Sequence, residues 1–179
     1  MWAFAIYDKT NRILFCSRDR LGVKPFHYWC DQNGFIFSSE LKQIAQIPFV
    51  KKTLNVDVFL TNFLFQMSDY NEETLIKEIK TLRPGHNLIV KISGEKIKVA
   101  EYSYWSLKIP KEKIKKDEVT VTKELENAIK KSLNYRLRSD IPIGGLLSGG
   151  LDSSSLLVLA REIEPRYKFE TFTASYEKE

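Results

Sequence analysis

The chain has 179 residues, of which 43% are hydrophobic and 28% charged, and its formal net charge is +5. This length and apolar content allow one moderate core or parts of two, and they exclude a disordered chain. Much of the positive excess lies in the lysines between Lys108 and Lys116, where no aromatic residues are interleaved. The charge therefore predicts a solvated linker and no nucleic-acid partner.

Signals for membranes, export and metal binding by cysteine are missing from the sequence. No apolar stretch approaches the roughly 20 residues that cross a bilayer, and Met1-Trp2-Ala3 lacks the basic start of a secretory signal. Cys16 and Cys30 lie inside apolar runs without a CxxC pair, so we expect free, buried thiols. These features predict a cytoplasmic protein with no membrane partner.

The first part of the chain predicts mainly strands. Turn signals divide residues 1–47 into a β meander and a short helix over 40–46 that Ser38 or Ser39 would cap; the strands are Trp2–Tyr7, Ile13–Ser17, Phe26–Cys30 and Phe35–Phe37. A second helix is expected to start at Asn55 or Asp57, with a shared apolar face made of Val58, Phe59, Phe63 and Met67. Alternation on both sides of Ser93-Gly94 predicts a hairpin over 87–102.

The composition changes at the basic, proline-containing stretch from Leu107 to Asp117, which shows no periodicity. We therefore predict one domain over 1–106, a linker over 107–118 and a second domain over 119–179. Apolar residues three and four apart between Val121 and Leu137 predict a helix of about five turns. A strand over 141–147, a helix over 152–164 and a strand over 167–176 then form a βαβ unit, which predicts the beginning of a parallel sheet.

The stretch "GGLLSGGLDSS" at 144–154 joins this strand to its helix. Backbone N–H groups at a helix N-terminus are unpaired and carry partial positive charge, so this turn predicts an anion site. Glycines let the backbone approach a phosphate closely, and hydroxyls of Ser148, Ser153 and Ser154 can add donors.

The spacing separates this turn from other nucleotide loops. Leu151 and Asp152 stand where a Walker A loop requires Lys and Ser or Thr, and no glycine pair has the spacing of GxGxxG. A nucleophile elbow would need glycine at Leu146, so Ser148 is not expected to be a nucleophile. Asp152 could hold a Mg²⁺ that neutralises departing pyrophosphate. In the alternative interpretation Asp152 only favours its own helix dipole, and the glycines only pack a tight corner.

Several motifs carry a resemblance to a known family. "LLSGGLDSS" at 146–154 resembles the PP-loop of the ATP pyrophosphatases, and "RLRSDIPIG" before it is similar to the lead-in of glutamine-hydrolysing asparagine synthetases. A second resemblance is to the later half of that family's glutaminase domain, and it rests on "WAFAIYD", "SRDRLGVKPFHY", "FSSELKQI" and "LRPGHNLIV". The resemblance implies an α+β and α/β chain, in which the C-terminal half of an Ntn-type, β-rich glutaminase sandwich precedes the start of a parallel-sheet PP-loop domain.

The same resemblance implies a reaction. The full enzyme would adenylate aspartate with release of pyrophosphate and amidate it with ammonia from glutamine, as a carbon–nitrogen ligase. ATP and Mg²⁺ are the implied cofactors, with Asp152 at the metal, and a homodimer is an option for the full-length enzyme. The residues expected at the nucleotide are Leu146, Leu147, Ser148, Gly149, Gly150, Leu151, Asp152, Ser153 and Ala174.

The family's glutaminase uses an N-terminal cysteine as nucleophile, whereas this sequence opens on Met1-Trp2. We therefore expect an internal fragment that does not hydrolyse glutamine and has no catalytic residue of its own. Two alternatives remain open: a sister amidotransferase, such as a β-lactam synthetase or an enzyme of a polysaccharide cluster, and a non-catalytic ATP-binding module.

The charged segment "SRDRLGVKPFHY" at 17–28 is predicted to be a structural loop, because Gly22 can adopt positive φ and Lys24-Pro25 favours extended chain. Its charges are expected to face the second domain. His86, in the turn "RPGH", is predicted to be a surface or packing histidine.

Overall fold

The computed structural model describes residues 1–32, 34–68, 70–93, 96–110 and 115–175. The chain divides into two compact units, Met1–Ile109 (unit 1) and Pro110–Glu179 (unit 2). Gly94 of the predicted hairpin turn, residues 111–114 of the predicted linker and Tyr176 of the predicted last strand lie outside the described residues. No helix in the described ranges is long and apolar enough to span a bilayer.

Unit 1 contains two antiparallel sheets. The first has the order β1-β2-β6-β7, with β1 at Ala3–Asp8, β2 at Ile13–Arg18, β6 at His86–Ser93 and β7 at Lys96–Ser103. The second has the order β4-β3-β5, with β3 at His27–Cys30, β4 at Phe35–Ser38 and β5 at Ile79–Thr81. The predicted hairpin is present as β6 and β7, which pair from His86–Ser103 to Ser93–Lys96.

The predicted β meander is wrong. β2 pairs with β6, placing Cys16 opposite Leu88, while β3 belongs to the other sheet and pairs with β4 and β5. Local turn signals define where strands end, but the partner of β2 lies about seventy residues further along the chain, where no local pattern indicates it. The segment between β2 and β3 carries the chain from one sheet to the other.

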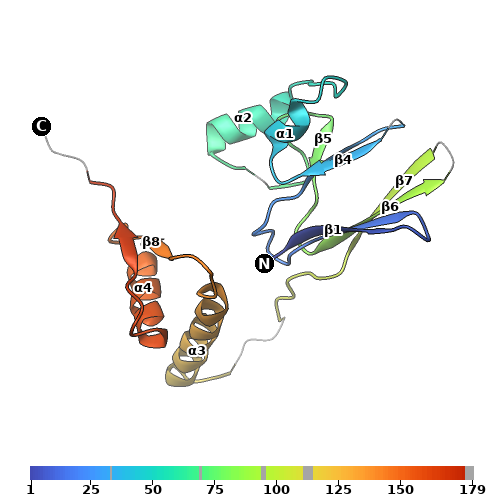
Figure 1. Cartoon of the computed structure of the whole chain (residues 1–179). Helices are drawn as coiled ribbons and strands as arrows, with labels where there is room; N and C mark the ends of the chain where they lie inside the picture. The colour runs from blue at the N-terminus through green and yellow to red at the C-terminus, as the bar shows by residue number, and fades with distance from the viewer. Residues whose placement is uncertain (33, 69, 94–95, 111–114, 176–179) are drawn as a thin grey trace, which may run out of the picture. The chain divides into compact units, whose positions relative to one another are not determined.

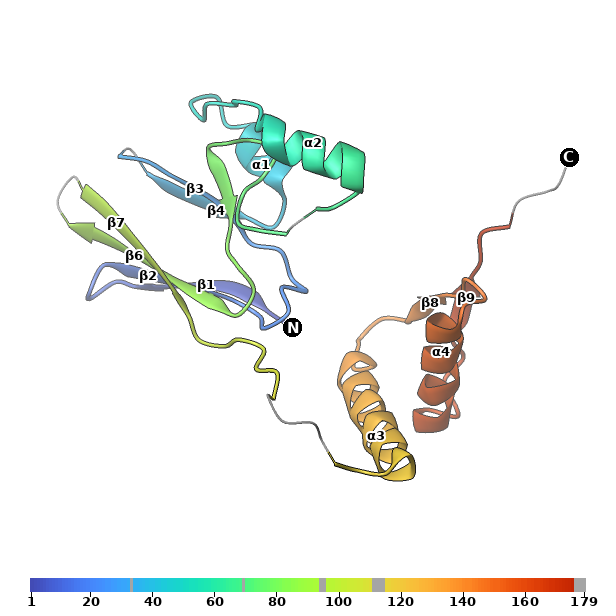
Figure 2. The same ribbon diagram turned by 180° about the vertical axis from the view of Figure 1, so that it is seen from behind.

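The two sheets pack face to face, with the helices α1 (Leu41–Ala45) and α2 (Val56–Phe65) on the far side of β4-β3-β5 (Figure 1). Figure 2 shows the same layers from behind. The core between the sheets consists of Cys16, Phe26, Tyr28, Leu82, Leu88 and Val90. A second cluster, made of Trp29, Ile44, Val50 and Ile79, lies on the opposite face of β3, because Tyr28 and Trp29 point to opposite sides of the sheet.

The two helices of unit 1 correct details of the prediction. α1 follows Glu40 without a side-chain cap, and the Ser38 hydroxyl donates instead to the Glu40 carbonyl at 2.7 Å, so the predicted serine cap is wrong. α2 is capped by Asn55, one of its two predicted starts. Of its predicted apolar face only Val58 is buried; Phe59 and Phe63 stack on each other in solvent and Met67 lies beyond the helix.

Unit 2 follows the predicted order of elements: α3 (Glu118–Arg136), β8 (Gly144–Leu146), α4 (Leu151–Ile163) and β9 (Glu170–Phe172). β8 and β9 pair in parallel from Gly144–Glu170 to Leu146–Phe172, as the βαβ pattern predicted. Helices α3 and α4 are joined by Lys130, whose ammonium group lies 2.6 Å from Glu126 and 2.7 Å from Glu162. This arrangement places the glycine-rich turn between the end of β8 and the start of α4.

Candidate functional site

The turn between β8 and α4 leaves the sheet in two steps. The Leu147 amide still donates to the Phe172 carbonyl at 2.9 Å, so pairing with the β9 side extends one residue beyond β8. The chain then turns at Gly149, whose φ of +78° lies in the left-handed region that favours glycine. A Cβ atom at Gly149 would have no neighbour within 4 Å, so open space adjoins the turn.

Not every glycine of this stretch serves the turn. A Cβ atom at Gly144 would lie 2.8 Å from the Phe172 ring, so Gly144 is needed for the close packing of β8 against β9. Gly150 is the N-cap of α4 in an extended conformation, with φ of −76°. The corner-packing interpretation therefore applies to Gly144, whereas Gly149 is required by the backbone turn itself.

The N-terminus of α4 presents backbone donors that nothing in the described chain accepts. Gly150 provides no side-chain cap, and the first bond of the helix runs from the Ser154 amide to the Gly150 carbonyl at 3.2 Å. Among the residues that the structure describes, the amides of Gly149, Leu151, Asp152 and Ser153 have no acceptor. Free amides at a helix N-terminus favour an anionic ligand.

Two hydroxyl groups lie over this turn. The Oγ atoms of Ser148 and Ser153 are 3.1 Å apart, and Ser153 also donates to the Gly150 carbonyl at 3.3 Å. The Gly150 amide donates to Ser148 Oγ at a long 3.4 Å. These contacts are exposed and replaceable, so both hydroxyls can turn to a bound phosphate.

Asp152, in the first turn of α4, lines a cavity of about 420 Å³ together with Ser153. The other walls are mainly apolar and come from α3, α4, the strands and the residue before β9, including Leu133, Leu156 and Phe169. Within the described ranges no hydrogen bond or ion pair engages the Asp152 carboxylate, which is therefore free to hold a cation. The described residues contain no group of three His, Cys, Asp or Glu that could hold a metal ion, so a cation at Asp152 would take further ligands from a phosphate or water.

The predicted nucleotide residues fall into two neighbouring segments. Residues 146–153 form the end of β8, the turn and the first turn of α4, and the side chains of Leu146 and Leu151 are 84% and 82% exposed. Ala174 lies two residues beyond β9, directly after Thr173, whose hydroxyl donates to the Leu147 carbonyl at 2.7 Å. The sequence did not predict the hydrogen bond from Thr173, because its acceptor, Leu147, lies 26 residues earlier in the chain.

The segment 17–28 has the structural role that the sequence predicted, but its buried charges face inward. The Asp19 carboxylate accepts hydrogen bonds from the amides of Trp2, Leu21, Val23 and Lys24, at 3.0 to 3.2 Å. Burial by itself would raise the pKa of Asp19, but these four bonds outweigh it and hold the pKa below its ordinary value. The side chain is 4% exposed, so the expectation that this charge faces the second domain is wrong.

Arg18 is the second buried charge of this segment. Its guanidinium group donates to the carbonyls of Gly22, Lys24 and Leu82 at 2.7 to 2.9 Å. A side chain that donates to three backbone carbonyls has a structural role, because these hydrogen bonds hold its guanidinium group inside unit 1. His86 likewise closes its own turn, since Nδ1 donates to the Pro84 carbonyl at 2.7 Å.

Both cysteines are free, as the sequence predicted, but the predicted burial is confirmed only for Cys16. Cys16 is fully buried, and burial raises the pKa of its thiol to about 12. Cys30 is half-buried, and burial followed by the Asp31 charge also raises its thiol pKa. Thiols with raised pKa values are poor nucleophiles at neutral pH.

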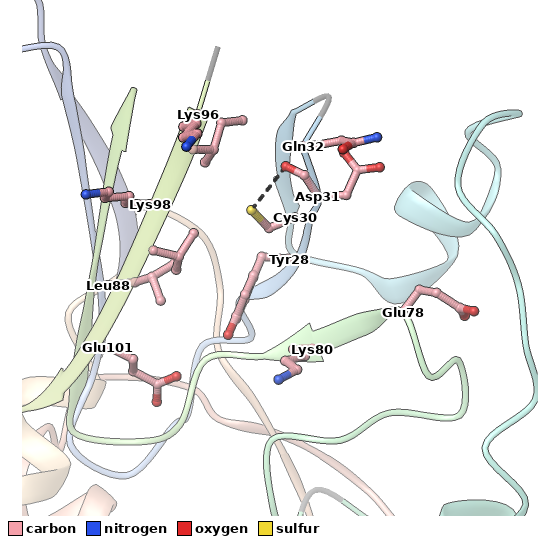
Figure 3. Close-up of a pocket in the computed structure, with 12 residues that line it drawn as sticks. Tyr28, Cys30, Asp31, Gln32, Glu78, Lys80, Leu88, Lys96, Lys98 and Glu101 are labelled. Atoms are coloured by element: carbon pink, nitrogen blue, oxygen red, sulfur yellow. Dashed lines mark hydrogen bonds between the residues drawn. The ribbon is translucent and has the colours of Figure 1, made fainter. Parts of the chain in front are cut away.

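Unit 1 has a larger cleft, of about 650 Å³, between its two sheets (Figure 3). Tyr28 and Cys30 from β3 face Leu88 and Glu101 from β6 and β7 across it. Glu101 is already paired with Arg83 at 2.8 Å, and Lys98 turns its ammonium group away from the cleft. The polar groups here do not converge on one point, so the turn in unit 2 is the stronger candidate site.

Comparison with known proteins gives two family matches, one in unit 1 and one in unit 2. Residues 1–105 match the glutamine amidotransferase domain family, and residues 124–179 match the asparagine synthase family. The first match places the chain in the class of glutamine amidotransferases.

Curated relatives narrow this class. A putative glutamine-hydrolysing asparagine synthetase 2 of Methanocaldococcus jannaschii is 38% identical over 99% of this chain and 34% of its own length. Glutamine-hydrolysing asparagine synthetase 3 of Bacillus subtilis is 32% identical over 99% of this chain and 28% of its length. The amidase chry2 of Gibberella zeae is 28% identical over 87% of this chain and 22% of its length.

The chain belongs to the family of glutamine-hydrolysing asparagine synthetases, as its motifs predicted. It spans about a third or less of the length of the curated relatives that it matches.

Proposed function

We propose that the turn between β8 and α4 binds the triphosphate of ATP, and that the chain supplies this turn to a glutamine-hydrolysing asparagine synthetase. The binding residues of the proposal are Leu146, Leu147, Ser148, Gly149, Gly150, Leu151, Asp152, Ser153 and Ala174. The observation that carries it is the set of four amides, those of Gly149, Leu151, Asp152 and Ser153, that have no acceptor in the described chain and lie beside the unengaged Asp152 carboxylate.

In the proposed reaction a carboxylate oxygen of aspartate attacks the α-phosphorus of ATP, and the bond to pyrophosphate breaks. Ammonia from glutamine then attacks the acyl carbon of the aspartyl adenylate and displaces AMP. The amides of the turn hydrogen-bond the phosphate oxygens, on which negative charge increases as pyrophosphate departs. Fixed backbone donors do this without reorganisation, which is the chemical advantage of such a turn.

The free carboxylate and the open turn fit a hydrated divalent cation. Asp152 is the residue that would hold Mg²⁺, which keeps several of its waters and is bound by one or two carboxylates together with substrate phosphates. When bound, the ion offsets the repulsion between Asp152 and the triphosphate. Without it, a carboxylate beside three phosphates would weaken nucleotide binding.

The fold assignments of the proposal follow the same family. The two face-to-face antiparallel sheets of unit 1 support the later part of an Ntn-type glutaminase sandwich, over 1–106. The parallel pairing of β8 with β9 through α4 supports the start of a PP-loop domain over 119–179, after a linker over 107–118. A homodimer and a cytoplasmic location complete the proposal.

The acyl substrate of the proposal is aspartate, because the relatives of 38% and 32% identity are both named asparagine synthetases. A sister amidotransferase would share the turn and differ in the acyl pocket, whereas a non-catalytic nucleotide-binding module would bind ATP without chemistry. Release of pyrophosphate from ATP therefore separates a synthetase from the module.

Calorimetric titration of the full 179-residue chain with ATP and Mg²⁺ tests the proposal. Asp152→Ala is expected to weaken binding by about 10-fold, roughly 1.4 kcal/mol. Asp57→Ala is a matched control, because Asp57 and Asp152 are each the second residue of their helix, α2 and α4. The control has the same helix-dipole effect and is expected to leave affinity unchanged.

A second arm omits the metal. With a chelator present, Asp152→Ala is expected to bind ATP at least as tightly as wild type, because the carboxylate then has no cation to hold and repels the triphosphate. Equal affinity of the two chains in the presence of Mg²⁺ would contradict the assigned role of Asp152, and a wild-type chain without affinity for ATP would contradict the proposal as a whole.

A further inference from the structure

The parallel pairing of β8 with β9 ends in an unusual way. In a parallel ladder, a residue donates its N–H to the residue before its partner and accepts from the residue after it. Leu147 keeps the first of these bonds, since its amide donates to the Phe172 carbonyl at 2.9 Å. The second bond would come from the Ala174 amide. Instead, the Thr173 hydroxyl donates to the Leu147 carbonyl at 2.7 Å.

This substitution of one donor by another has two structural effects. The Leu147 carbonyl is fixed at the point where the chain turns toward Ser148 and Gly149. The Ala174 amide, relieved of the ladder bond, has no acceptor in the part of the chain that the structure describes. The strand after β9 can therefore diverge from the turn and offer a backbone donor beside it.

We propose that Thr173 is a positioning residue of the nucleotide site. Its hydroxyl ends the parallel ladder, orients the first residue of the turn and leaves the Ala174 amide available to the nucleotide. The inference rests on the proposed function of the turn. It adds a residue that touches no phosphate itself and acts through the two segments that do.

A matched pair of variants separates the hydroxyl from the rest of the side chain. Thr173→Val keeps the shape and β-branching but cannot donate a hydrogen bond, whereas Thr173→Ser keeps the donor and loses a methyl group. One exposed hydrogen bond corresponds to roughly a 2- to 10-fold change in an equilibrium. Thr173→Val is accordingly expected to weaken binding of ATP with Mg²⁺ by about that factor, and Thr173→Ser to restore most of it.

Amide hydrogen exchange of the ligand-free chain, followed by NMR, provides a readout that is independent of nucleotide. Thr173→Val is expected to speed exchange of the Leu147 amide, and Thr173→Ser is expected to keep it slow. The Glu164 amide, bonded to the Ala160 carbonyl at the far end of α4, serves as an internal control that neither variant changes. A variant that unfolded the unit would speed exchange at both amides.

The outcomes are distinct. If wild type binds ATP and Thr173→Val binds it equally well, the inference is overturned and the proposed function stands, even where exchange at Leu147 increases. If Thr173→Ser is as impaired as Thr173→Val, the hydroxyl is not the group that matters and the inference is again overturned. A wild-type chain that binds no ATP overturns the proposed function and this inference with it.

Discussion

Two turns of this chain have similar ingredients and opposite arrangements. The segment after β2 contains Asp19 and a glycine at positive φ, Gly22 at +65°. The segment after β8 contains Asp152 and a glycine at positive φ, Gly149 at +78°. In the first, four backbone amides donate to the aspartate, which is 4% exposed. In the second, the aspartate is exposed and four amides, those of Gly149, Leu151, Asp152 and Ser153, have no acceptor in the described residues.

The comparison teaches how a structural turn differs from a binding turn. Both hold more backbone donors than an ordinary connection. In unit 1 the chain supplies the anion itself, as the Asp19 carboxylate, so the turn is complete without a ligand. In unit 2 the donors remain available and the carboxylate lies beside them, which suits an anion that arrives with its own cation.

The largest expected effect concerns the completed turn. Asp19→Ala removes the acceptor of four part-buried amides, and leaving a buried donor unpaired costs about 1–3 kcal/mol. We expect the free energy of unfolding of unit 1 to fall by at least about 3 kcal/mol. Urea unfolding followed by tryptophan fluorescence measures this, since Trp2, Trp29 and Trp105 all lie in unit 1. A loss below about 1 kcal/mol would show that water replaces the carboxylate.

The same variant has a pH signature. Because the folded state holds the pKa of Asp19 below its ordinary value, the carboxylate contributes stability above roughly pH 3.9, the unfolded value. That contribution is lost as the pH falls through the lower folded pKa. The difference in stability between wild type and Asp19→Ala is therefore expected to shrink on acidification. A difference that stays constant from pH 6 to pH 2 would contradict the assigned bonds.

The next effect compares the two glycines. Alanine at positive φ costs about 1–2 kcal/mol at either position. At Gly22 the new Cβ atom would also lie 2.8 Å from Pro84, whereas at Gly149 it meets nothing within 4 Å. Gly22→Ala should therefore destabilise unit 1 more than Gly149→Ala destabilises unit 2, measured by fluorescence and by amide exchange respectively. Of the two variants, only Gly149→Ala should weaken ATP binding. Weaker ATP binding by Gly22→Ala alone would contradict the distinction between the two turns.

The sequence predicted those parts of the fold that depend on neighbouring residues. Turn residues and alternation defined the ends of β1 to β4 and the β6–β7 hairpin, and the βαβ pattern defined unit 2. The pairing of β2 with β6 was not predictable in this way, because it joins residues far apart in the chain. The burial of Arg18 and Asp19 was missed for a related reason: charged residues favour solvent unless a specific set of partners surrounds them, and that set is formed only by the fold.

In the candidate site, too, the local features were predictable from the sequence and the long-range contact was not. Residues 146–153 are contiguous, so glycine spacing and helix capping were enough to predict an anion site. Thr173 acts across 26 residues, and its only local signal is a hydroxyl residue at the end of a strand. The apolar residues of α2 were predicted to share a face, but their exposure was not predictable, since periodicity indicates which residues lie together and not what covers them.

The most direct test of the account is an NMR titration of the ¹⁵N-labelled chain with pyrophosphate and Mg²⁺. We predict saturable shifts of the amide signals of Gly149, Leu151, Asp152 and Ser153, with the amides that donate to Asp19 unchanged. Shifts confined to the cleft between the sheets of unit 1, or no saturable shift at all, would contradict the claim that this turn is an open anion site.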